Sequence, residues 1–67
     1  MSAWLDQIFN SQIAQIGGVV RRKLSSIRRY SSEAELKAEV KRRGYHIVEH
    51  GNQWLIFCDQ AAVRIIA

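Results

Sequence analysis

The sequence predicts an α+β fold in which an N-terminal amphipathic helix and a second, basic helix pack on an antiparallel β-hairpin or a small three-stranded sheet. Three observations support this fold: a helical apolar period in residues 1–16, start and stop signals around residues 33–43, and two strand-like runs separated by Gly51-Asn52. With 67 residues, the chain has room for one domain. Its composition, 48% apolar and 24% charged, is typical of a folded protein.

Residues 1–16 have the pattern of an amphipathic helix. Their large apolar residues recur on one side of a 3.6-residue period, with Ser2 as the expected cap and Gly17-Gly18 as the joint to a core of residues 19–67. Because a helix face this apolar is unfavourable in water, we expect it to pack on the protein's own core or on a partner. Contact with a membrane surface is the least favoured alternative, because the polar face of this helix carries no Lys or Arg. The candidate interface residues are Trp4, Leu5, Ile8, Phe9, Ile13 and Ile16.

Residues 19–30 combine two patterns. Val19-Val20, after two glycines, favours a short strand, whereas Val20, Leu24 and Ile27 recur at helical spacing. We therefore expect a brief extended start followed by a helical turn.

The helix expected over residues 33–43 has signals at both ends. Ser32 and Glu35 form a Ser-x-x-Glu capping box, and Gly44 stands where a left-handed residue ends a helix. Favourable i,i+4 ion pairs are expected between Glu33 and Lys37 and between Glu39 and Arg43.

The two runs 45–50 and 53–59 are rich in β-branched and aromatic residues, and a two-residue Gly51-Asn52 loop between them suits a type II′ turn. This hairpin makes both of its faces largely apolar, so helices or another subunit are expected to cover both. Residues 61–67 are a candidate third strand. The register pairs Glu49 with Trp54, Ile47 with Ile56 and Tyr45 with Cys58 on one face, and Val48 with Leu55 and His46 with Phe57 on the other.

Positive charge is concentrated in residues 21–43, called here the basic segment. It holds nine of the ten Lys and Arg residues against three Glu, a local charge of +6, whereas the remainder sums to −2. A concentrated positive field attracts polyanions, so nucleic acid or an acidic protein is the expected partner. The candidate nucleic-acid-binding residues are Arg21, Arg22, Lys23, Arg28, Arg29, Tyr30, Lys41, Arg42 and Arg43, with Tyr30 as a possible base-stacking ring.

Two alternatives to nucleic-acid binding stay open. Lys41, Arg42 and Arg43 also complement the negative end of their helix dipole, which explains part of the charge without any ligand. The alternative function is a protein-interaction adapter or a homo-oligomer, such as a homodimer, whose interface is the apolar helix or sheet face.

Catalysis, metal binding and cofactors are not predicted. His46 and His50 share a strand face, but four residues along a strand span about 13 Å, too far for one metal ion. Cys58 and His46 fall on opposite faces of the hairpin, so they do not form a nucleophile and base. No P-loop, His-Glu-x-x-His or Cys-x-x-Cys pattern occurs.

A small RNA-cleaving enzyme using His46 or His50 is kept as a third possibility. Residues 36–57, with a basic helix, Lys-Arg-Arg-Gly-Tyr and a Gly-led hairpin, resemble the small mRNA interferase toxins of toxin–antitoxin pairs. That family has a catalytic histidine after the hairpin glycine, whereas here Asn52 follows Gly51. The resemblance therefore does not imply the activity.

A cytoplasmic location is the expectation. Cys58 is the single cysteine, so no internal disulfide forms, and the N-terminal residues lack the pattern of a secretory signal. No apolar run approaches the roughly 20 residues of a membrane span.

Overall fold

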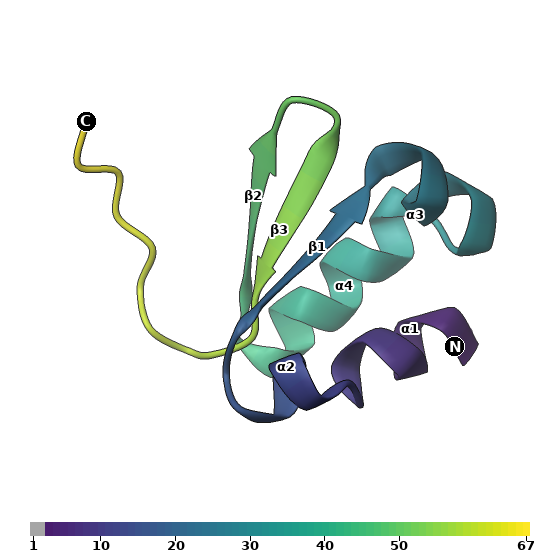
Figure 1. Ribbon diagram of the computed structural model, residues 1–67, viewed down its shortest axis with the longest axis horizontal. Coiled ribbons are helices and arrows are strands. Elements are labelled where there is room, and N and C mark those ends of the chain that lie inside the picture. Colours follow the sequence, from purple (N-terminus) through teal and green to yellow (C-terminus); the bar gives the residue numbers. More distant parts are fainter. Residues whose placement is uncertain (1–2) are drawn as a thin grey trace.

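The computed structural model describes residues 3–67, which form an α+β fold with four helices and a three-stranded antiparallel sheet (Figure 1). The predicted fold class is confirmed. The helices gather on one side of the sheet, and the C-terminal residues leave the base of the sheet as an extended tail (Figure 1). In chain order the elements are α1 (Ala3–Phe9), α2 (Gln12–Gln15), β1 (Val19–Lys23), α3 (Leu24–Tyr30), α4 (Glu33–Arg43), β2 (His46–His50) and β3 (Gln53–Phe57).

The N-terminal segment is two short helices rather than the single helix expected over residues 1–16. The Ser11 hydroxyl donates a hydrogen bond to the Ile8 carbonyl at 2.7 Å and accepts one from the Ala14 N–H at 3.3 Å. A serine side chain that satisfies the backbone on both sides competes with continued helix and starts α2 instead. Ser2, the expected cap of the first helix, lies outside the described residues.

The central strand of the sheet is β3, flanked by β1 and β2. The predicted hairpin register is confirmed within β2 and β3, with Ile47 opposite Ile56 and Val48 opposite Leu55, whereas the expected pair of Tyr45 with Cys58 lies beyond the ends of these strands. The extended start expected at Val19 is present as β1, and this segment is the third strand of the sheet in place of the candidate residues 61–67, which form no strand. The physical reason is burial, because β1 brings Val20 into the core whereas every tail residue is exposed.

Helix α4 and the hairpin turn begin and end where the sequence predicts. The Ser32 hydroxyl accepts a hydrogen bond from the Glu35 N–H at 3.0 Å, and Gly44 ends α4 with a φ of 74°, a conformation that glycine adopts without steric cost. Gly51 has a φ of 60°, and no non-glycine residue within 3–67 has a positive φ. The turn is therefore of the II′ type, with Gly51 first.

The core lies between the sheet and the helices. Ile27, Leu36 and Ile56 are fully buried there, which joins α3, α4 and the central strand. Three of the six candidate interface residues, Leu5, Ile8 and Phe9, are buried in this same core. Trp4 packs at the margin of the core, and Ile13 and Ile16 are exposed. The N-terminal helices therefore bury apolar side chains in the same core as α3, α4 and the sheet.

Candidate functional site

The sheet has one face that no helix of the described chain covers (Figure 1). Side chains alternate along a strand, and Val20, Trp54 and Ile56 point to the helix side, where they are buried. The residues between them point the other way and form what we call the open face. Its members are Val19, Arg21 and Lys23 from β1, Gln53, Leu55 and Phe57 from β3, and His46, Val48 and His50 from β2.

Strand register arranges the open face as an apolar centre with a polar rim. Leu55 and Phe57 lie on the central strand and, with Val48, are half-buried, whereas Arg21 and Lys23 are exposed on the edge strand β1. The three rows across the sheet are Val19, Phe57 and His46; Arg21, Leu55 and Val48; and Lys23, Gln53 and His50.

No acidic residue lies among the nine members of the open face. The only acid in the three strands, Glu49, falls on the helix side by alternation, and its carboxylate accepts a hydrogen bond from Trp54 Nε1 at 3.0 Å. Arg21 and Lys23 have no carboxylate within ion-pair distance in residues 3–67. The open face therefore carries uncompensated positive charge beside apolar side chains.

At the hairpin end of the open face lies a shallow depression of about 350 Å³. Its wall combines Arg21 with the polar residues His50 and Gln53 and with the hairpin turn. Residues that donate and accept hydrogen bonds are thus placed next to a positively charged residue. The lining residues are Arg21, His50, Gly51, Asn52, Gln53 and Leu55.

The candidate binding residues of α3 lie apart from the open face and have partners of their own. Arg28 Nε donates to the Glu33 carboxylate at 2.8 Å, so the expected pair between Glu33 and Lys37 is wrong. The Arg28 guanidinium, on the preceding helix α3, occupies the Glu33 carboxylate in place of Lys37. The Tyr30 ring stacks on Trp4 with centroids 5.9 Å apart and also has the Arg29 guanidinium 5.4 Å from its centroid.

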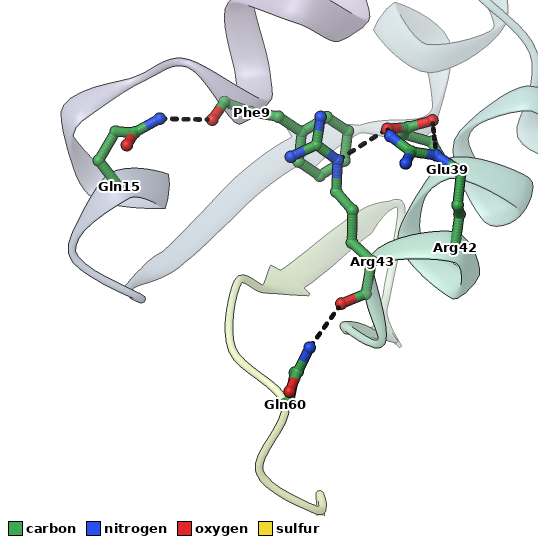
Figure 2. A network of polar contacts seen from close by, with 6 residues as sticks. All are labelled: Phe9, Gln15, Glu39, Arg42, Arg43 and Gln60. Carbon is green, nitrogen blue, oxygen red and sulfur yellow. Dashed lines mark hydrogen bonds and ion pairs between the residues drawn. The ribbon is translucent and has the colours of Figure 1, made fainter.

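Arg42 and Arg43 are held by Glu39 at the end of α4, as Figure 2 shows. Arg43 Nε donates to the Glu39 carboxylate at 2.7 Å, which confirms that predicted pair, and its guanidinium lies 4.4 Å from the Phe9 ring centroid. The hydrogen bond from Arg42, supported by Arg43, lowers the pKa of Glu39 to about 2 although burial opposes the shift. Arg43 thus joins α4 to α1.

The remaining candidates, Arg22 and Lys41, also lie off the open face. Arg22 points to the helix side by alternation, and its guanidinium donates to the Arg21 carbonyl at 2.7 Å. Lys41 is exposed on α4, in a groove between that helix and β2 that Tyr45 and His46 also line. Of the nine residues proposed from the basic segment, the structure brings Arg21 and Lys23 together on the open face.

The apolar centre of the site was not among the sequence-predicted site residues. The hairpin register already places Val48 beside Leu55 and His46 beside Phe57 on one face. The sequence did not indicate that β1 pairs with β3, and this pairing adds Arg21 to that face opposite Leu55, which lies 34 positions later in the chain (55 − 21).

The site has no arrangement that supports catalysis by the cysteine. Cys58 is buried on the helix side, where burial raises the pKa of its thiol, and His46 lies on the open face. Within residues 3–67, no three His, Cys, Asp or Glu side chains gather closely enough to hold a metal ion. None of the described helices has the length and hydropathy of a membrane span.

Comparison with known proteins gives no match to this chain. No family model fits the sequence, and no curated protein or solved structure is significantly similar to it. The function proposed below is therefore inferred from the geometry of the open face.

Proposed function

We propose that this protein binds nucleic acid through the open face of its sheet. The observation that carries the proposal is the placement of Arg21 opposite the half-buried Leu55, on a face without a carboxylate that also presents Lys23 and the half-buried Phe57. Cations pair with backbone phosphates, and apolar or aromatic side chains contact bases.

The combination of cations with partly exposed apolar side chains supports the proposal more strongly than the positive charge alone. A basic surface that only keeps a protein soluble has no need of apolar side chains between its cations. Leu55 and Phe57 remain in contact with water in the free chain, and a ligand that covers them removes apolar surface from water. A nucleic acid supplies both a flat apolar partner and an anion.

Two double variants with the same change in net charge test the location of the site. Arg21→Gln with Lys23→Gln removes the cations of the open face, and Arg28→Gln with Arg29→Gln removes two from α3. Binding of labelled oligonucleotides of about 12 nucleotides is measured by fluorescence anisotropy at about 50 and 200 mM salt.

The open-face variant is expected to bind about tenfold more weakly at the lower salt, because two exposed charge contacts of about 0.5 to 1 kcal/mol each are lost. The α3 control should change by less than about threefold. Two neutralised phosphates give a log–log salt slope of about −1.4 to −1.8 in the unaltered protein. Equal losses in both variants would refute the open face as the site, and no binding to any oligonucleotide would refute the function.

Self-association is a second candidate function, favoured by a separate observation. Ile16, Ile65 and Ile66 are 78%, 85% and 76% exposed, although large apolar side chains at such exposure are unfavourable in water. Light scattering coupled to size-exclusion chromatography measures the mass in solution and so distinguishes a self-associating protein from a monomer. A dimer that loses mass when Ile65 and Ile66 become Ser would support self-association, and a monomer at all concentrations would exclude it.

A further inference from the structure

We infer that the open face is a stacking platform for single-stranded RNA, with Phe57 as the ring on which a base stacks and Arg21 as the adjoining phosphate contact. This inference rests on the proposed nucleic-acid binding and names the ligand class of the same site.

Phe57 differs from every other aromatic residue in the described chain. Trp4 stacks on Tyr30, Phe9 lies against Tyr45 and under a guanidinium, and Trp54 has an ammonium group 5.6 Å from its ring centroid. Among the aromatic residues of 3–67, Phe57 alone has neither a ring partner nor a cation over its ring. Its ring is thus uncommitted, on the central strand of a face that no helix covers.

The neighbours of Phe57 suit a nucleotide. Val19 and His46 lie directly opposite it on the two edge strands and widen the platform on both sides. Arg21 is its diagonal neighbour, a position about 7 to 8 Å away that a long side chain reaches. A base stacked on Phe57 would therefore have its phosphate within reach of the Arg21 guanidinium.

This geometry selects single strands over duplexes. In a duplex the faces of the bases are stacked on one another, so a ring on a sheet surface has no base face to contact. A duplex would meet only the cations of the open face, and Arg21 and Lys23 are just two such groups. Single strands expose base faces and use both parts of the site.

The polar rim favours ribose over deoxyribose. Asn52, Gln53 and His50 line the depression next to Arg21, and amide and imidazole groups both donate and accept hydrogen bonds. A 2′-hydroxyl has the same dual capacity, and deoxyribose lacks it. A strand that runs from Phe57 along β3 toward the hairpin turn passes these groups.

The test uses the full chain and three probes of equal length and sequence: single-stranded RNA, the same RNA as a duplex, and single-stranded DNA. Phe57→Leu keeps an apolar side chain of similar size but removes the aromatic face, and Phe57→Tyr keeps the aromatic face. Circular dichroism and thermal melts confirm that both variants fold. NMR of the Phe57 ring protons provides a readout of stacking that a purely structural role would not move.

We expect single-stranded RNA to bind about tenfold more tightly than either other probe, and Phe57→Leu to lose about tenfold on that RNA while Phe57→Tyr stays within about threefold. Added RNA should shift the Phe57 ring signals upfield. If Phe57→Leu binds normally but the Arg21 and Lys23 variant does not, nucleic-acid binding stands and stacking is refuted. Equal affinity for DNA refutes the ribose preference, tighter duplex binding refutes the platform, and no binding refutes the proposed function itself. A change in mass of Phe57→Leu by light scattering would assign the face to a second copy of the chain.

Discussion

Trp54 Nε1 donates a hydrogen bond to the Glu49 carboxylate at 3.0 Å, across the hairpin between β3 and β2. Strand alternation places the one acid of the strands on the helix side, opposite Trp54, and the hydrogen bond joins its carboxylate to this residue, which is 4% exposed. The open face is consequently free of negative charge. The register thus puts the Glu49 carboxylate where it accepts the indole hydrogen bond and keeps it off the face that carries Arg21 and Lys23.

Loss of the Glu49 carboxylate should destabilise the protein through Trp54. Glu49→Ala leaves the buried indole N–H without its acceptor and should lower the free energy of unfolding by about 1 to 3 kcal/mol. Glu49→Gln keeps an acceptor oxygen and should lower it by less than about 1 kcal/mol. Urea denaturation of the two variants checks this, and equal losses would show that the hydrogen bond does not matter.

Acid should destabilise the protein through Glu39. The pKa of this carboxyl, about 2 in the folded protein against an ordinary 4.5, means that the unfolded chain binds its proton more readily. The contribution is therefore fully present above about pH 4.5 and is lost as pH falls toward 2.

Glu39→Gln should lower the stability by about 1 to 3 kcal/mol at neutral pH, less than the full shift implies, because the Arg42 side chain is 63% exposed to solvent. The variant should also show a shallower loss of stability between pH 5 and 2 than the unaltered protein. Denaturant melts across this pH range measure both effects. Parallel pH profiles for the two proteins would contradict the assignment.

Neighbouring residues of β3 should differ in their effect on stability. Ile56 is fully buried on the helix side, so Ile56→Ala should cost about 2 to 5 kcal/mol through the lost contacts and the cavity. Leu55 is half-buried on the open face, so Leu55→Ala should cost about 1 to 2 kcal/mol. Chemical denaturation of the matched pair tests which face is the core, and a reversed order would contradict the fold.

The two ends of the chain should respond differently to truncation. Deletion of residues 1–16 removes Leu5, Ile8 and Phe9 from the core and should leave a chain that aggregates or fails to fold. Deletion of residues 63–67, all exposed, should change the stability by less than about 0.5 kcal/mol. Circular dichroism and melting curves distinguish these outcomes, and a stable fold without residues 1–16 would show that the N-terminal helices are an appendage.

The sequence alone determined those parts of the structure that depend on neighbours a few positions apart. The Ser32 cap, the left-handed Gly44 and the Gly51-Asn52 turn are local, and the turn sets the register that pairs Ile47 with Ile56. Such features are predictable because the interacting groups are close along the chain in any compact state.

Only the tertiary structure decided the site. Pairing of β1 with β3 brings Arg21 beside Leu55 and diagonal to Phe57, and no local signal in β1 specifies that partner strand. In the folded chain Arg42 and Arg43 form ion pairs with Glu39. The basic segment, continuous in sequence, is therefore separated into arginines that are paired within the protein and cations that lie on the open face. Long-range pairings depend on which apolar faces are buried together, and this is a property of the whole chain rather than of any segment.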